Sequence, residues 1–148
     1  MKICVGCDHG AIELKKAVLE VLREFPHIET EDVGTFSEDS VDYPDIAQRV
    51  CQRIVSGEAD RGIVLCGTGI GISIAANKIK GIRAALCSDV FSARMSREHN
   101  DANVLAMGGR VIGVGPASEI VRVWIDTEFS NGERHKRRIE KTMALENM

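Results

Sequence analysis

The residues best suited to do chemistry stand where an apolar segment meets a glycine-rich loop. The segment 62–66 is apolar throughout, ends at Cys66 and is followed by Gly67-Thr68-Gly69-Ile70-Gly71. An unbroken apolar run predicts a strand buried on both faces, and glycines between a strand and a helix leave backbone N–H groups free to bind an anion. Beside Cys66, these donors would favour the thiolate and would stabilise an oxyanion that forms next to it.

The glycine spacing restricts what this loop can bind. A dinucleotide fingerprint needs G-x-G-x-x-G, but position 72 is Ile; a Walker A loop needs G-K-[ST], which is absent. We therefore expect a cradle for an anion smaller than a dinucleotide, and a nucleotide-binding module is disfavoured. The alternative for Cys66 is an inert buried thiol that closes a core strand.

Polar residues also follow two other predicted strands. Asp8 and His9 come after the strand at 3–6, and Arg110 comes just past the strand at 103–107. Ligands of open α/β sheets bind outside the carboxyl ends of the strands, so these residues and Cys66 are expected to share one edge. Any one of these residues alone would be interpreted as a surface residue. Their common position at the carboxyl edge of the sheet favours a ligand-binding or catalytic site.

A basic run at 134–138 opens the last predicted helix. Arg134 and Arg138 stand four apart on one face, at the helix end where cations are disfavoured by the dipole. An anion bound between them would reverse both effects, and guanidinium groups suit phosphate. The alternative is a solvated face paired with the nearby acids Glu128, Glu133 and Glu140.

His99 closes the predicted helix at 89–98 and is followed by Asn100, a residue that tolerates a left-handed backbone. A histidine at a helix end is commonly just a cap. A crossover helix returns toward the amino ends of the strands, so His99 should lie opposite Cys66. If His99 is catalytic, one solution is a dimer in which it reaches the site of the other subunit.

These residues depend on an alternation of strands and helices. Strands are predicted at 3–6, 28–33, 62–66, 82–87 and 103–107. Helices are predicted at 14–25, from Pro44 to 55, after the glycine loop, at 89–98, from Pro116, and from Arg134. Such alternation implies right-handed βαβ units and a parallel sheet with helices on both faces.

Length and composition exclude several classes of protein. The 148 residues are 44% hydrophobic and 28% charged, which predicts one globular domain, 1–148. A net charge of −3 and few aromatic residues argue against nucleic-acid binding. No apolar run is long enough to cross a membrane and the start does not resemble a signal peptide, so a cytoplasmic protein is expected.

The cysteines are expected to be reduced, because five is an odd number and no export signal is present. Cys4 and Cys7 spell C-x-x-C, but residues three apart in a strand point to opposite faces. A redox pair or a metal site at this motif is therefore disfavoured.

Together, the motifs resemble the type B ribose-5-phosphate isomerases over nearly the whole chain. The resemblance implies a Rossmann-like α/β/α sandwich with a parallel five-stranded sheet, no metal or other cofactor, and a homodimer or dimer of dimers with sites at the subunit interface. The family also contains allose-6-phosphate and galactose-6-phosphate isomerases. The motifs that carry the resemblance are Gly6-Cys7-Asp8-His9-Gly10, Asp42-Tyr43-Pro44, Cys66-Gly67-Thr68-Gly69-Ile70-Gly71-Ile72-Ser73, Gly81-Ile82-Arg83-Ala84, Ser96-Arg97-Glu98-His99-Asn100-Asp101-Ala102-Asn103 and Arg134-His135.

The resemblance also implies a reaction and residue roles. Ribose 5-phosphate and ribulose 5-phosphate would interconvert through an enediolate, a step of the pentose phosphate pathway. Cys66 would be the base, His99 would assist ring opening, Asp8 would handle hydroxyl protons, and Thr68 would be a further catalytic residue. The sugar and its oxyanion would be held by Tyr43, Asn100 and the loop Gly67, Thr68, Gly69, Ile70 and Gly71, and the phosphate by His9, Arg110, Arg134 and Arg138. A six-carbon phosphosugar as substrate, or a non-catalytic phosphosugar-binding protein, are the alternatives.

Overall fold

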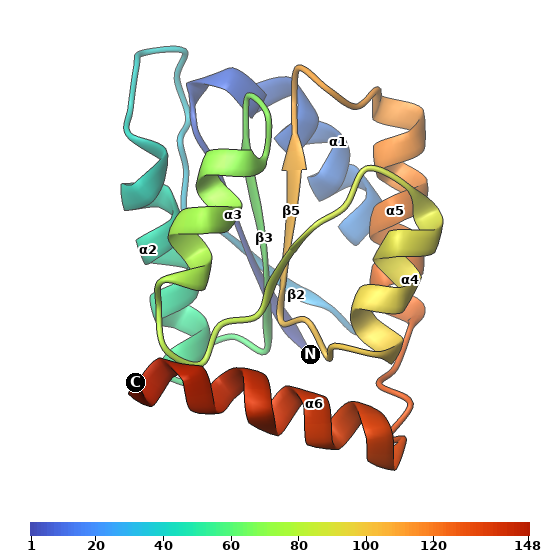
Figure 1. Ribbon diagram of the computed structural model, residues 1–148. Helices are drawn as coiled ribbons and strands as arrows, with labels where there is room; N and C mark the ends of the chain where they lie inside the picture. The colour runs from blue at the N-terminus through green and yellow to red at the C-terminus, as the bar shows by residue number, and fades with distance from the viewer.

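A computed structural model describes all residues 1–148 as a parallel sheet between two layers of helices (Figure 1). The five strands lie in the order β2-β1-β3-β5-β4, and every neighbouring pair is parallel. The predicted fold class, a Rossmann-like α/β/α sandwich, is therefore confirmed. The elements are β1 (Lys2–Cys7), η1 (His9–Ala11), α1 (Ile12–Leu22), β2 (Glu29–Asp32), α2 (Tyr43–Val55), β3 (Arg61–Cys66), α3 (Ile70–Asn77), β4 (Ala84–Leu86), α4 (Val90–Glu98), β5 (Val104–Gly108), α5 (Val114–Asp126), α6 (Glu133–Ala144) and η2 (Leu145–Asn147).

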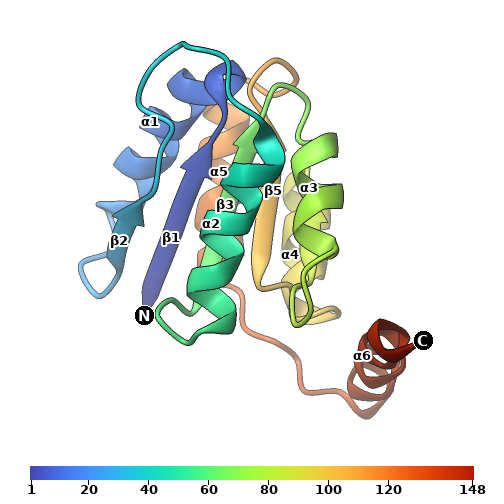
Figure 2. The same cartoon turned by 90° about the vertical axis from the view of Figure 1, so that its left-hand side faces the viewer.

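Each face of the sheet has its own apolar core. Helices α1, α4 and α5 cover one face, and α2 and α3 cover the other (Figure 2). Cys7 packs in the first core and Cys4 in the second, as the period of a strand predicts. Burial raises the pKa of Cys4 to about 12 and that of Cys7 to about 11. The two thiols of the C-x-x-C motif therefore do not form a pair.

Several predicted boundaries are wrong. Helix α5 begins at Val114, and Pro116 stands in its first turn, where its missing N–H leaves no helical bond unmade. Helix α1 ends at Leu22 rather than at 25, because Phe25 precedes a proline and so avoids the helical conformation. The strands predicted at 28–33 and 82–87 are shorter, at Glu29–Asp32 and Ala84–Leu86.

Helix α6 is set apart from the two helix layers. It crosses the amino ends of the strands in Figure 1 and stands clear of the other helices in Figure 2. None of its residues is buried, although Ile139 and Met143 are half-buried. Helices of this length are marginal in water without packing partners. The half-buried Ile139 and Met143 leave part of their apolar surface exposed, and a further contact could cover it. None of the helices has the length and hydropathy that crossing a bilayer requires.

Candidate active site

Three neighbouring strands deliver polar residues to the carboxyl edge of the sheet. Because β1, β3 and β5 are adjacent, the ends that carry Asp8, Cys66 and Arg110 lie together (Figure 1). Backbone hydrogen bonds join the segments that follow the strands: Asp8 N–H donates to the Leu65 carbonyl at 3.0 Å, and Arg110 N–H to that of Gly67 at 2.9 Å. The grouping expected from the strand ends is present in the structure.

The Cys66 sulfur contacts the glycine loop directly. Gly69 N–H donates to Cys66 Sγ at 3.1 Å, and Cys66 is 4% exposed. Gly69 has a left-handed backbone with φ of +78°, and a Cβ there would lie 2.6 Å from Leu86 Cδ1. Only glycine fits this position without displacing its neighbours. The loop is therefore held against Cys66 with a donor that stabilises negative charge on sulfur.

The same loop presents unused donors. The Ile70 N–H donates to Thr68 Oγ1 at 3.2 Å, whereas the N–H groups of Thr68, Gly71 and Ile72 have no intramolecular acceptor. They stand at the N-terminus of α3, where the helix dipole favours an anion. These free donors are what the predicted anion cradle would require.

A cavity of about 480 Å³ is lined by Asp8, His9 and residues 40–45, which include the Tyr43 that packs against Gly71 of the loop. Asp8 is 7% exposed, and its Oδ1 accepts the Gly10 N–H at 2.8 Å. Val41 N–H donates to His9 Nδ1 at 3.2 Å, which makes Nδ1 an acceptor and places the proton of neutral His9 on Nε2. His9 can therefore donate a hydrogen bond to a ligand.

Tyr43 and Arg110 border the loop on two sides. A Cβ at Gly71 would lie 2.6 Å from Tyr43 Cζ, and a Cβ at Gly67 would lie 3.2 Å from Arg110 Nη1. The phenol and the guanidinium are thus packed against loop backbone. Arg110 is exposed and forms no ion pair in the structure. Its charge is available to an anion.

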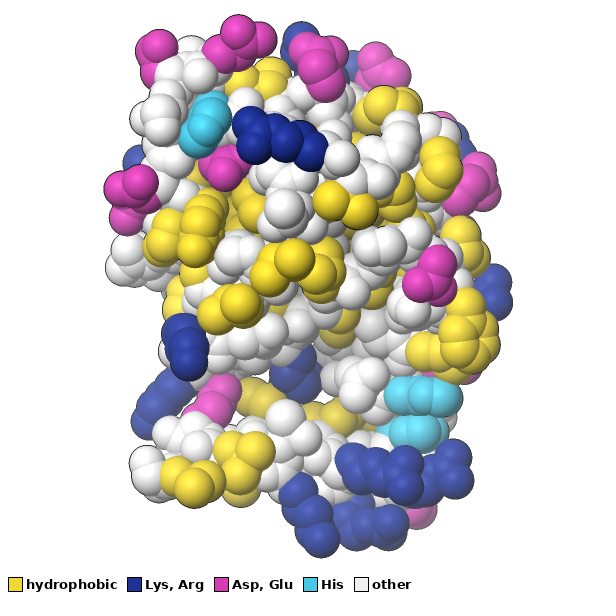
Figure 3. All heavy atoms as spheres, turned by 45° about the horizontal axis from the view of Figure 1, so that its top comes forward, with side chains coloured by type: hydrophobic (Ala, Val, Ile, Leu, Met, Phe, Trp, Pro, Cys, Tyr) yellow, Lys and Arg dark blue, Asp and Glu magenta, His cyan; other side chains and the backbone are white.

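A second group of predicted residues lies at the opposite edge. His99 follows α4, and its ring stacks on that of His135 with centroids 4.2 Å apart. Figure 3 shows two His side chains in contact beside a cluster of Lys and Arg side chains, and the stacked histidines of the chain are His99 and His135. Asn100 and Arg138 line a cavity of about 670 Å³ beside α6. Desolvation, and then the charges of His99, Arg134 and Arg138, lower the pKa of His135.

The basic run of α6 has no acidic partners. Neither Arg134 nor Arg138 takes part in any ion pair, and Glu128 instead faces Arg61 at 3.9 Å. The helix is a solvated face, but the structure shows no ion pair between these two arginines and the nearby acids. Guanidinium groups without an acidic partner, one in the first turn of the helix and one a turn further on, remain suited to bind an anion.

Within one chain the predicted residues therefore form two separate groups. The carboxyl edge holds Asp8, His9, Tyr43, Arg110 and the segment 66–71. The amino edge holds His99, Asn100, Arg134 and Arg138. The structure does not bring the second group to Cys66, in agreement with the expected return of the α4 crossover.

Sequence reasoning missed residues that hold these groups in place. Lys15 is 4% exposed, and its Nζ binds Asp32 at 3.0 Å and the Thr35 carbonyl at 2.7 Å, which anchors the start of the loop leading to Tyr43. Arg83 and Arg97 surround the turn after His99. For Lys15, the sequence does contain a signal: a basic residue lies within the apolar stripe of a predicted helix. No local pattern indicates the arginine partners.

Known proteins share this fold and much of this sequence. The model of the Ribose/Galactose Isomerase family matches residues 3–142. Ribose-5-phosphate isomerase B of Escherichia coli is 48% identical over 145 residues, which cover 98% of this chain and 96% of that protein. The galactose-6-phosphate isomerase subunit LacB of Clostridium acetobutylicum is 43% identical over 129 residues, 87% of this chain and 74% of that protein.

A solved structure agrees over nearly the whole chain. Ribose-5-phosphate isomerase B of Clostridium thermocellum matches with a TM-score of 0.95 and 52% identity, covering 99% of this chain and 98% of that one. Fold, sequence and the extent of the family match lead to the same conclusion. The chain belongs to the Ribose/Galactose Isomerase family and is a sugar phosphate isomerase.

Proposed function

We propose that the chain interconverts ribose 5-phosphate and ribulose 5-phosphate, with Cys66 as the base. The observation that carries this proposal is the bond from Gly69 N–H to Cys66 Sγ at 3.1 Å, inside a loop in which the N–H groups of Thr68, Gly71 and Ile72 have no intramolecular acceptor. The thiolate removes the proton from C2 and returns it to C1, while the free donors stabilise the enediolate oxygen. A protein that only bound phosphosugars would need the donors but not the thiol.

Proton transfer between the sugar oxygens falls to Asp8. As C2 loses its proton and C1 gains one, a proton must also leave the C2 hydroxyl and reach the C1 oxygen. Asp8 uses Oδ1 for the Gly10 N–H, which leaves Oδ2 without a hydrogen bond in the structure, and the residue lines the cavity formed with residues 40–45. Its position at the end of β1, next to β3, suits this role.

The remaining groups come from a second copy of the chain in a homodimer. His99 and Asn100 lie at the amino edge, where they would open the furanose ring and orient the sugar of the partner's site. Arg134 and Arg138 would complete a phosphate site begun by His9 and Arg110. The unburied helix α6 and its unpaired arginines support this arrangement, because both are suited to contact another molecule. Such an enzyme would serve the pentose phosphate pathway in the cytoplasm.

The test is ketose formation from ribose 5-phosphate by the purified chain in the presence of a chelator. Allose 6-phosphate is assayed in parallel, because one carbon changes the distance from C2 to the phosphate by only about 1.3 Å. Fast turnover of the pentose supports the proposal, and turnover of the hexose alone would replace the substrate. Absence of turnover with both, together with a melting temperature raised by phosphosugars, would contradict catalysis and favour a binding protein.

A further inference from the structure

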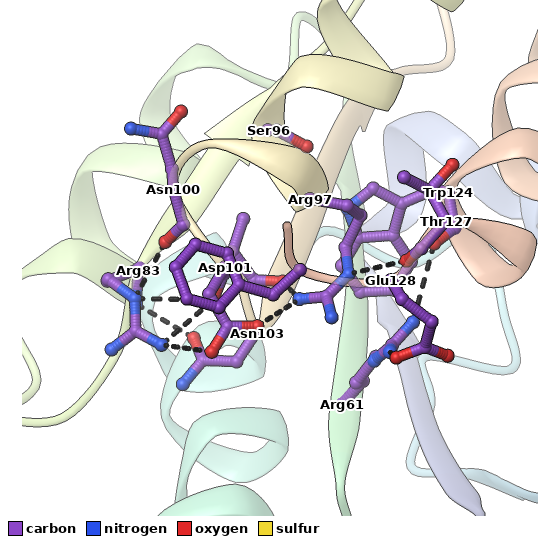
Figure 4. Close-up of polar contacts among 12 residues, drawn as sticks. Arg61, Arg83, Ser96, Arg97, Asn100, Asp101, Asn103, Trp124, Thr127 and Glu128 are labelled. Carbon is purple, nitrogen blue, oxygen red and sulfur yellow. Dashed lines mark hydrogen bonds and ion pairs between the residues drawn. The ribbon is translucent and has the colours of Figure 1, made fainter. Parts of the chain in front are cut away.

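The turn that carries His99 and Asn100 depends on the residue that follows them. Asp101 has a left-handed backbone, with φ of +44°, which is uncommon for a residue other than glycine. Its side chain accepts hydrogen bonds from two arginines: Arg97 at the end of α4, four residues earlier, and Arg83 just before β4, 18 residues earlier (Figure 4). The geometry of this turn is therefore set by tertiary contacts as well as by its own sequence.

Arg97 links the turn to the end of α5. Its side chain is 4% exposed, and Nη1 donates to Asp101 Oδ1 at 2.9 Å and to the Ala102 carbonyl at 2.6 Å. Its Nε donates to the Thr127 carbonyl at 3.3 Å (Figure 4). The Trp124 ring, 5.8 Å from the guanidinium carbon, packs beside it. Thr127 begins the segment that leads to α6, so Arg97 connects both parts of the amino-edge group.

Arg83 holds the same turn from the other side. Its Nε donates to the Asn100 carbonyl at 3.0 Å, and its Nη2 donates to the Asp101 carbonyl at 2.8 Å. The remaining nitrogen, Nη1, lies 3.6 Å from Met143 Sδ on α6. Arg83 therefore contacts the backbone of the turn and α6 at once.

The arginines of this edge divide into two kinds. Arg134 and Arg138 have no acidic partner, whereas every nitrogen of Arg83 and two of the three nitrogens of Arg97 are bonded to the protein. Most nitrogens of Arg83 and Arg97 are thus committed to the protein itself, whereas those of Arg134 and Arg138 are not. The planar, rigid shape of a guanidinium holds several acceptors in a defined relation, which the single ammonium of lysine cannot do.

We propose that Arg83 and Arg97 are positioning residues, which hold His99 and Asn100, through Asp101, in a fixed relation to α6 and its phosphate-binding arginines. This inference rests on the proposed function, because it concerns the residues that act in the partner's site. A displacement of about 1 Å in a reacting group can reduce a rate by about 100-fold. Loss of the Arg97 contacts should therefore act on kcat through His99.

The experiment is a double-mutant cycle on ribose 5-phosphate turnover. We expect Arg97→Lys to lower kcat by about 10- to 100-fold when His99 is present. In a His99→Ala background the same substitution should lower kcat by a clearly smaller factor, since of the two groups it positions only Asn100 remains. Equal losses in both backgrounds would overturn the proposal, because a general loss of structure predicts that result.

Two further variants guard against misfolding. Arg83→Gln changes a less buried arginine that contacts the same turn, and it should show the same dependence on His99 if Arg97→Lys does not fold. Arg122→Lys is the matched control, since Arg122 on α5 pairs with Glu24 at 2.8 Å and Glu119 at 2.7 Å on the surface. It should leave kcat and KM unchanged in either background.

An NMR measurement separates this inference from the proposed function. The chain has four histidines, so their ring resonances can be assigned by single substitutions. Arg97→Lys should shift the resonances of the stacked pair His99 and His135 and leave those of His9 and His27 in place. If the wild type converts no phosphosugar, the proposed function fails and this spectrum still decides the inference. A folded variant in which His99 does not move would refute it.

Discussion

Mixing two inactive variants tests whether each active site is shared between two copies of the chain. Cys66 and His99 lie at opposite edges of the sheet, so Cys66→Ala and His99→Ala damage different halves of the site. In a heterodimer of the two variants, one site carries both substitutions and the other carries neither. Random pairing of equal amounts makes about half of the molecules heterodimers, each with half of its sites intact. About a quarter of the wild-type activity should therefore return.

The assay uses co-expression with two affinity tags, so that heterodimers can be purified and their composition verified by mass. Purified heterodimers should have about half of the wild-type activity per chain, against at most about 1% for each parent. The matched control pairs Cys66→Ala with Asp8→Ala, which damage the same edge and should not rescue each other. Verified Cys66→Ala/His99→Ala heterodimers no more active than their parents would refute the shared site.

Three further outcomes follow from the structure. Cys66→Ala should lower kcat by about 10²- to 10⁴-fold, which corresponds to about 3 to 5 kcal/mol in the barrier. Cys66→Ser keeps an acceptor for the Gly69 N–H, so it should fold equally well but remain slow. Steady-state kinetics and melting curves check both variants. Arg134→Ala should mainly raise KM, because the phosphate is unchanged by the reaction and its binding energy is uniform; a loss confined to kcat would contradict this. In the folded chain the pKa of His135 is lowered from its usual value of 6.5. The unfolded chain therefore binds more protons at pH values around and just below 6.5, so the free energy of unfolding should decrease as the pH falls through 6.5. Melting temperatures at about pH 7.5 and about pH 5.5 should differ less for His135→Gln than for the wild type.

The carboxyl edge of the site could be predicted because it depends on local patterns. An unbroken apolar run ending at Cys66 predicts a buried strand, and the parallel direction of βαβ units places Asp8, Cys66 and Arg110 at one edge. That β1, β3 and β5 are neighbours in the sheet is not encoded in any one segment. It follows from how the helices pack on the two faces, which periodicity alone does not determine.

The supports of the site could not be predicted, because their partners are distant in sequence. Arg97 stands on a helix whose polar face looks ordinary, yet it is buried against Thr127, 30 residues further on. His9 accepts from the Val41 N–H, 32 residues away, and this bond determines which ring nitrogen faces a ligand. Sequence patterns indicate which residue types can do chemistry, whereas tautomers and guanidinium partners are properties of the folded chain.

The topology of the sheet explains why two copies are needed in the proposed reaction. A helix that follows one parallel strand must return to the start of the next, so the last residue of α4 lies at the amino edge. Strand β3 has six residues, which separates the two edges by about 20 Å. Proton transfer needs the two groups to be about 3 Å apart, and no movement of a side chain can bridge the separation between the two edges. Placing the amino edge of one copy against the carboxyl edge of another closes this distance, and a twofold axis makes two equal sites at once. Association of two chains is therefore a condition of the proposed chemistry, and helix α6, which the rest of its own chain leaves unburied, is the element suited to secure it.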